Sequence, residues 1–261
     1  HQMPVAQGAG PHNLTVMYNG LIRMNPNDGM QTIMPDLADK WEISADGMIY
    51  KFHLREGVKW HDGAMLKVDD VIATFERIVN PPDNIAIGIQ SLFTEIDSIE
   101  DAGDNWVQFN LKRPSAHQFN AFTMLNATIL PKKCLEENNF DVREVVCPGT
   151  GPFKFVEWKP SQYMKMVKFD KYWKKDKNGN QLPYVDTVLV KPIKDATTRF
   201  LALKSGDIDW SYAIPFDQIP EIQKNKPDWI KPQIESGARW IFIHLQQSKK
   251  HNGPLRKKKV R

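Results

Sequence analysis

The sharpest constraint on the fold is a run of five residues near the middle of the chain, Pro148-Gly149-Thr150-Gly151-Pro152. Proline fixes the backbone φ angle and glycine permits conformations that other residues avoid, so no helix or regular strand continues through this run. We expect a segment that crosses between two substructures. A phosphate-binding loop is less favoured, because no Lys-Ser or Lys-Thr pair follows and the glycine spacing of a dinucleotide-binding motif is missing.

Strand-like and helix-like patterns alternate before this run. Tyr50, Phe52 and Leu54 alternate with polar residues, as in a half-buried strand, and a second strand is expected at 58–60 after a tight turn. Apolar residues at helical spacing predict a helix over 68–79, with two aspartates in its first turn, where the helix dipole favours acids. The other expected elements are a helix or buried strand at 14–24, a short apolar element at 33–43, two strands within 93–111, and helices at 115–125 and 131–137.

After the run, strands dominate and helices are short. The expected strands are 153–158, 163–169, 185–193, 208–211, 229–234 and 240–245. Helices are expected at 196–204 and 216–223, with a polar loop at 174–182. Strands and helices mixed in this order, with no internal repeat, predict an α/β (mixed α+β) fold.

Composition excludes several classes of protein. The 261 residues fit one large domain or two small ones, and 41% hydrophobic with 25% charged residues is close to the globular average. Collagen-like, disordered and disulfide-framework chains are therefore excluded. No run of about 18 apolar residues is present, so no membrane-spanning segment is expected.

The positive net charge comes from the end of the chain. The formal charge is +4, but seven of the 35 basic residues lie among the last thirteen positions, where no acid occurs. The remainder carries 28 basic against 31 acidic residues and is slightly acidic. Binding of nucleic acid would require a basic face on the body of the protein, so no nucleic-acid partner is expected.

Few residues stand in a pattern that suggests chemistry. His53 and His61 flank a turn, but only Asp62 is near as a third ligand, so we interpret them as surface histidines and expect no metal site. Cys134 and Cys147, with twelve residues between them, could close a disulfide loop in an oxidising compartment; two free or buried thiols are the favoured interpretation. No serine, cysteine or histidine lies in a recognisable triad motif, so we expect neither catalysis nor a cofactor.

A long ordered block of motifs resembles one known family. The block runs through PDLADKWEISADG at 35–47, YKFHLREGVKWHDG at 50–63, VDDV at 68–71 and FER at 75–77. Further matches are GTGPF at 149–153, DKYW at 170–173 (with Asp170 in place of the usual Asn), FLALKSGDID at 200–209, and short pieces at 254–255 and 260–261. Together they resemble the extracytoplasmic solute-binding proteins of the peptide/nickel class, family 5, which serve ABC importers.

The resemblance implies a periplasmic binding protein-like lobe with an inserted α+β subdomain. Members have about twice this length and close two lobes on a ligand, so the second lobe is expected to be missing here. The implied parts are a first piece of lobe I at 1–35, the inserted subdomain at 36–148, a second piece of lobe I at 149–245, and a truncated crossover at 246–261.

The resemblance also implies a function and a site. The expected function is the capture of di- or oligopeptides in the periplasm, or by a lipid-anchored protein outside the cytoplasmic membrane, and their delivery to an ABC permease, with the intact protein a monomer. The ligand-binding residues expected from matching positions are His12, Asn13, Tyr18, Arg239, Trp240 and His244. For Tyr18 and Trp240, a place in the core is the more common role of such residues.

Two other functions stay open at this point. Nickel-type relatives bind a chelated metal, and the histidines of this chain do not exclude such cargo. An orphan binding protein that presents its ligand to a receptor is the second alternative.

Overall fold

The computed structural model describes residues 14–83, 85–211 and 214–225. The chain divides into two compact units, His1–Thr198 and Arg199–Arg261. The boundaries expected at 35 and 148 are not where this division falls, and they stay a prediction. In the part of the chain that the structure describes, no helix is long and apolar enough to cross a membrane.

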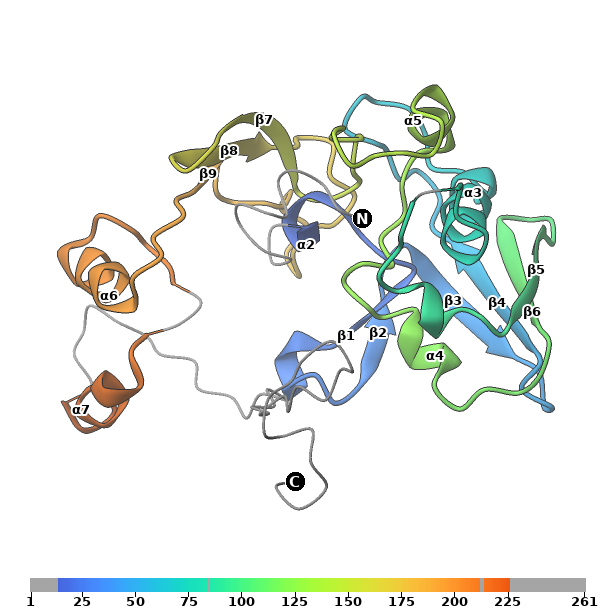
Figure 1. Cartoon of the computed structure of the whole chain (residues 1–261), viewed down its shortest axis with the longest axis horizontal. Coiled ribbons are helices and arrows are strands. Elements are labelled where there is room, and N and C mark those ends of the chain that lie inside the picture. Colours follow the sequence, from blue (N-terminus) through green and yellow to red (C-terminus); the bar gives the residue numbers. More distant parts are fainter. Residues whose placement is uncertain (1–13, 84, 212–213, 226–261) are drawn as a thin grey trace, which may run out of the picture. The chain divides into compact units, whose positions relative to one another are not determined.

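The first unit contains an antiparallel four-stranded sheet in the order β3-β4-β6-β5 (Figure 1). Its strands are β3 (Ala38–Ile43), β4 (Ile49–Leu54), β5 (Ile96–Asp101) and β6 (Trp106–Leu111). Along β4 the side chains alternate, so that Tyr50, Phe52 and Leu54 are buried. This alternation confirms the predicted half-buried strand, and the two strands predicted within 93–111 are β5 and β6.

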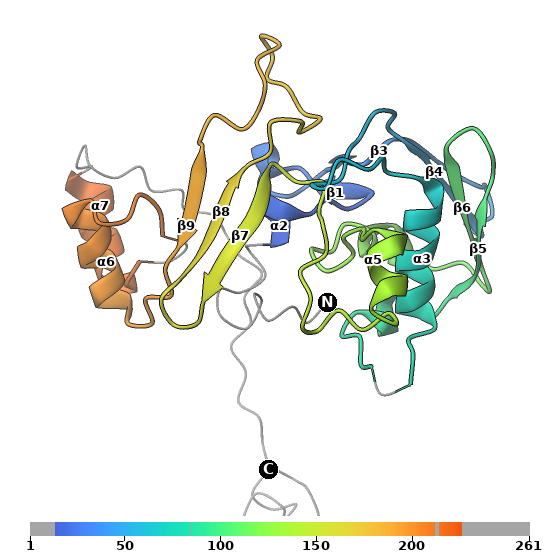
Figure 2. The ribbon, with the colours of Figure 1, turned by 90° about the horizontal axis from the view of Figure 1, so that it is seen from above.

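Helix α3 (Val68–Val79) lies against one face of this sheet (Figure 2). Its bounds are those that the apolar spacing predicts. Five phenylalanine rings from the helix, the sheet and the following loops meet there, with centroids of neighbouring rings 4.9 to 5.8 Å apart. They are Phe52, Phe75, Phe93, Phe109 and Phe122, and each is fully buried. Tilted and edge-to-face contacts of this kind contribute to the stability of the core beyond the area they bury.

One carboxylate joins the start of α3 to the start of α5. Asp70 accepts a hydrogen bond from the Lys67 amide at 2.9 Å, which caps the helix, and another from the Lys132 amide at 2.8 Å. Lys132 begins helix α5 (Lys132–Glu137), which lies beside α3. Burial raises the pKa of Asp70 despite these donors. The aspartate predicted as a simple dipole charge therefore also fixes the position of α5.

A second antiparallel sheet, β7-β8-β9, follows the crossing segment. Its strands are β7 (Phe153–Lys159), β8 (Tyr163–Lys168) and β9 (Thr187–Val190). Met164 and Met166 of β8 are buried in a hydrophobic cluster with Met17 and Phe153. Before both sheets, α2 (Leu14–Met17) leads into a ribbon of β1 (Ile22–Met24) and β2 (Ile33–Pro35).

The described part of the second unit is helical. It contains most of α6 (Ala196–Ser205), a 3-10 turn η4 (Phe216–Gln218) and α7 (Ile219–Asn225). Gly206 follows α6 with φ +82°, which fits a glycine helix stop. The strand predicted at 208–211 is wrong, because these residues pair with no strand of the described chain.

Two other local predictions are also wrong. Residues 58–60 form no strand; they make one isolated bridge, between Lys59 and Met65, because this stretch turns back on itself. The helix predicted over 115–125 is only α4 (Gln118–Ala121). The strands predicted at 229–234 and 240–245 lie outside the described residues.

Replacing Gln118 by methionine should stabilise the protein by about 1–2 kcal/mol. The Gln118 side chain is fully buried, and neither its Oε1 nor its Nε2 atom has a hydrogen-bond partner. Methionine has a similar shape and removes both unsatisfied polar atoms. Urea unfolding measures the change. Gln108→Met is the control, because Gln108 donates to Asn110 at 2.8 Å and its loss should not stabilise. Destabilisation by Gln118→Met would show that the amide is satisfied in solution.

Candidate functional site

The crossing segment lies directly against the main chain of Met17. The Gly151 amide donates a hydrogen bond to the Met17 carbonyl at 2.9 Å. A Cβ atom on Gly149 would lie 1.8 Å from that carbonyl oxygen, and one on Gly151 would lie 2.5 Å from the Met17 carbonyl carbon. Both glycines are therefore required by close approach of two backbones. The predicted crossing is held against the N-terminal part of the unit.

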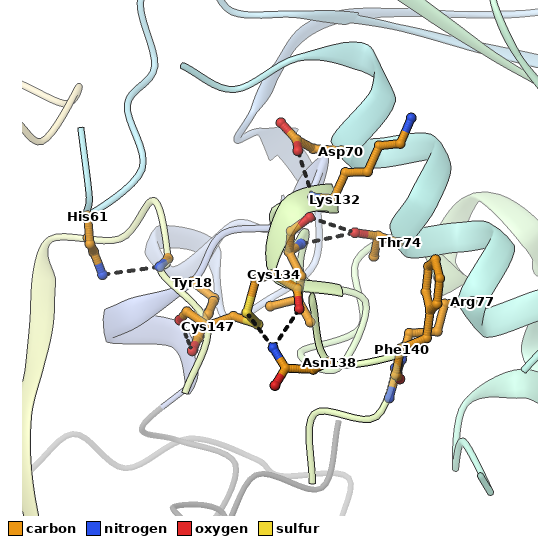
Figure 3. The surroundings of a disulfide bond; sticks show 12 residues. Tyr18, His61, Asp70, Thr74, Arg77, Lys132, Cys134, Asn138, Phe140 and Cys147 are labelled. Atoms are coloured by element: carbon orange, nitrogen blue, oxygen red, sulfur yellow. Dashed lines mark hydrogen bonds between the residues drawn. A yellow bond between two sulfur atoms is a disulfide. The ribbon is translucent and has the colours of Figure 1, made fainter. Parts of the chain in front are cut away.

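His61 binds the same segment through three hydrogen bonds. Its amide donates to the Gly149 carbonyl at 2.9 Å. The Gly149 amide donates to its Nδ1 atom at 3.1 Å, the dashed line drawn at His61 in Figure 3. Its Nε2 atom lies 3.0 Å from the Gly151 carbonyl. Burial, the largest effect, lowers the pKa of His61 to about 4. The interpretation of His61 as a surface histidine is wrong, because contacts distant in sequence partly bury it.

A chain of polar side chains continues from this segment. The Thr150 hydroxyl donates to Asn19 Oδ1 at 3.1 Å, and Asn19 Nδ2 donates to the Asp36 carboxylate at 3.0 and 3.2 Å. Lys174 Nζ donates to the same carboxylate at 2.7 Å. Thr150, Asn19 and Asp36 are buried. Four segments far apart in sequence are joined by this chain.

Cationic side chains lie around Asp36, the last residue of this hydrogen-bonded series. Lys174 Nζ lies 4.5 Å and the Arg55 guanidinium 5.0 Å from the centroid of the Trp173 ring. Arg55 Nε also donates to the Asp36 carbonyl at 2.7 Å. Burial lowers the pKa of Lys174, and the Asp36 carboxylate opposes this effect. The geometry is that of an ion pair between Lys174 and Asp36, with both cations stacked on one aromatic face.

A disulfide bond fixes the start of the crossing segment. Cys134 of α5 is bonded to Cys147, so the favoured interpretation of two free thiols is wrong. The Cys147 carbonyl accepts a hydrogen bond from the Tyr18 hydroxyl at 2.7 Å, and Asn138 Nδ2 donates to the Cys134 carbonyl at 2.8 Å (Figure 3). The disulfide, Tyr18 and His61 thus hold neighbouring parts of one segment.

A family model for bacterial extracellular solute-binding proteins, family 5, matches residues 32–261. The chain belongs to this family. The match confirms the resemblance that the sequence motifs carry, and the solved relatives confirm the mixed α/β, periplasmic binding protein-like fold.

Individual family 5 relatives have different ligands in their names. The glutathione-binding protein GsiB of Pectobacterium atrosepticum is 32% identical over 84% of this chain, and the dipeptide-binding protein of Escherichia coli is 30% identical over 81%. The solved PBP AgaA of A. tumefaciens R10, in complex with agropinic acid, is 31% identical over 82% of this chain with a TM-score of 0.73. The chain spans 41% of the length of each of these relatives.

Of the ligand-binding residues expected from the sequence, the structure places Tyr18. Its side chain is 2% exposed and its hydroxyl is bonded to Cys147, so the structure puts it in the core, where a role in positioning the segment fits better than contact with ligand. Burial raises the pKa of its hydroxyl. His12, Asn13, Arg239, Trp240 and His244 lie outside the described residues, and their role stays a prediction.

The sequence analysis missed the polar residues that join the crossing segment to the N-terminal part of the unit; this set is called the junction below. Asn19, Asp36, Thr150 and Lys174 were not singled out, although Asp36 and Thr150 fall within the family motifs. Their role depends on contacts across as many as 138 positions, which no local pattern reveals. Within the described ranges, no group of three or more His, Cys, Asp or Glu side chains is placed to hold a metal ion. His53 instead bonds Asp39 at 2.7 Å.

Proposed function

We propose that this chain is part of the substrate-binding component of an ABC uptake transporter that captures di- or oligopeptides. The family match over residues 32–261 carries the proposal. The relatives named for glutathione and for dipeptides support a peptidic ligand. On this proposal the protein acts in the periplasm, or on a lipid anchor outside the cytoplasmic membrane, and delivers its ligand to a permease.

The proposed mechanism is closure of two lobes on the ligand. Contacts that exist only in the closed state shift the equilibrium toward it. Hydrogen bonds to the peptide backbone and water-filled side-chain pockets would give broad specificity. In this scheme the junction of Met17, Asn19 and the crossing segment keeps the N-terminal part of the lobe in place. The predicted ligand-binding residues His12 and Asn13 directly precede that part.

The chain alone should bind peptides at millimolar affinity or weaker, whereas the full-length protein should bind them at micromolar affinity, about −8 kcal/mol. The reason is that the chain spans 41% of the length of its relatives, so part of the contact surface is expected to come from the remainder. Isothermal titration of both proteins with a pool of di- to pentapeptides measures this difference.

The titration has two informative alternatives. Micromolar binding by the chain alone would show that one lobe holds a complete site. A parallel titration uses nickel chelated by histidine. If the full-length protein binds this complex and no peptide, the peptide proposal is contradicted and a chelated-metal cargo is favoured.

A further inference from the structure

The imidazole of His61 is bonded in a way that only one protonation state permits. The Gly149 amide is a donor, so the Nδ1 atom at 3.1 Å must accept and cannot carry a proton. The Gly151 carbonyl is an acceptor, so Nε2 at 3.0 Å must carry the proton. The neutral Nε2–H tautomer satisfies both contacts, and the other neutral tautomer satisfies neither.

A second proton on the ring would break one of these bonds. Protonated Nδ1 would point its N–H at the Gly149 N–H, and two donors cannot bond each other. The Gly149 amide would also lose its acceptor, and leaving a buried amide unpaired is unfavourable. Burial of the charged ring is also unfavourable, so we expect the protonated ring to leave its position and to lose the bond from Nε2 to the Gly151 carbonyl as well.

We propose that His61 is a pH-sensitive latch: its neutral ring holds the crossing segment at Gly149 and Gly151, and its protonation releases them. This conformational device is independent of the identity of the transported ligand. It gives an extracytoplasmic protein a local response to the pH of its surroundings.

The groups around His61 act on its charge in both directions, and the Gly151 carbonyl that accepts from Nε2 favours the charged ring. Lys154 of β7 is a cation that opposes a positive charge on the ring, and Asp62 is the carboxylate that favours one. The Phe169 ring lies edge-on at 5.1 Å, with Lys154 5.7 Å above the same ring. No carboxylate of the described chain forms an ion pair with His61. Burial is thus the main reason for the low pKa of about 4.

The direction of the pH effect follows from linkage. The latched ring has a pKa of about 4, whereas a released histidine titrates near the ordinary value of 6.5. Between these values the released state binds the proton more strongly, so the latch weakens as the pH falls below about 6.5 and reaches its weakest below about 4. At pH 5 the ratio of latched to released protein should be about 30-fold lower than at pH 7.5.

Release should stay local, because other contacts hold both ends of the segment. The disulfide fixes Cys147 at the start, and at the other end the Pro152 carbonyl accepts a hydrogen bond from the Phe169 amide at 2.8 Å. The bonds that weaken are those of Gly149 and Gly151 with His61, beside the contact of Gly151 with Met17. We therefore expect increased opening around Gly149–Gly151 without loss of either sheet.

Nitrogen-detected NMR of the wild-type chain tests the latch without any substitution. The expected result is an Nε2–H tautomer for His61 at pH 7.5 and a titration midpoint at least one pH unit below the ordinary histidine value of about 6.5. Amide exchange of Gly149 and Gly151, corrected for intrinsic rates, should become faster relative to the amides of β4 as the pH falls. An Nδ1–H tautomer, or a midpoint near 6.5 in the folded chain, would overturn the proposal.

His61→Asn provides the second test. The Asn Oδ1 atom can take the place of Nδ1 as acceptor for Gly149, but it does not titrate in this range. The variant should be less stable than wild type at pH 7.5, and its loss of stability between pH 7.5 and 5 should be smaller by about 30-fold in the unfolding equilibrium constant, or about 2 kcal/mol. His117→Asn is the matched control and should keep the wild-type pH dependence. Equal pH dependence in His61→Asn and wild type would contradict the latch.

Discussion

Gly149→Ala should destabilise the folded chain by at least about 3 kcal/mol, because the new methyl group has no space. The added Cβ atom would lie 1.8 Å from the carbonyl oxygen and 2.8 Å from the carbonyl carbon of Met17. Both are main-chain atoms, and Met17 is buried, so no flexible side chain can move aside. The Gly149 amide and carbonyl are also bonded to His61, which prevents the loop from shifting without breaking those bonds.

Gly88→Ala is the control for this substitution. A Cβ atom at Gly88 would meet nothing within 4 Å, so the change should be neutral or slightly stabilising. Denaturant unfolding of both variants, followed by tryptophan fluorescence, gives the difference in the free energy of unfolding. If Gly149→Ala proved as stable as Gly88→Ala, the close contact between the crossing segment and Met17 would not exist in solution.

Elements whose signal lies in neighbouring residues could be predicted from the sequence. The alternation in β4 and the helical spacing in α3 report which side of each element is buried, and both elements have the predicted bounds or nearly so. The strand expected at 58–60 is wrong although its local pattern of burial is correct. Val58 and Trp60 are buried, as a strand pattern suggests, but their backbone turns and pairs only at Lys59 and Met65. Burial of alternate residues does not by itself make a strand.

The junction could be located from the sequence but not explained by it. The proline and glycine residues of 148–152 predict a break in regular structure, and no residue of this run lies in a helix or strand. That the run crosses between two substructures stays a prediction. What the glycines touch depends on Met17, more than 130 positions earlier, and what their amide and carbonyl groups bind depends on His61, 88 to 90 positions earlier. The histidine carries no local signal, because a buried and an exposed histidine in a turn have the same neighbours in sequence.

Loss of the disulfide should lower the free energy of unfolding by about 3 kcal/mol. Cys134 and Cys147 are 13 positions apart, and closing a loop of that size removes conformational entropy from the unfolded chain. The bond also joins α5 to the segment that Tyr18 and His61 hold, so its loss frees the point where the segment begins. The double variant Cys134→Ser/Cys147→Ser and wild type with reductant should both show the loss in guanidinium unfolding.

The double variant supplies its own control. The chain contains two cysteines, so reductant has no other disulfide to act on and should leave the unfolding of the double variant unchanged. The serine variant should still fold, because the hydrogen bond from Tyr18 uses the main-chain carbonyl of residue 147 and does not require sulfur. Equal unfolding midpoints for wild type with and without reductant, with free thiols confirmed by alkylation, would mean that the bond does not stabilise this junction. The hydrogen bonds of Tyr18 and His61 would then hold the segment on their own.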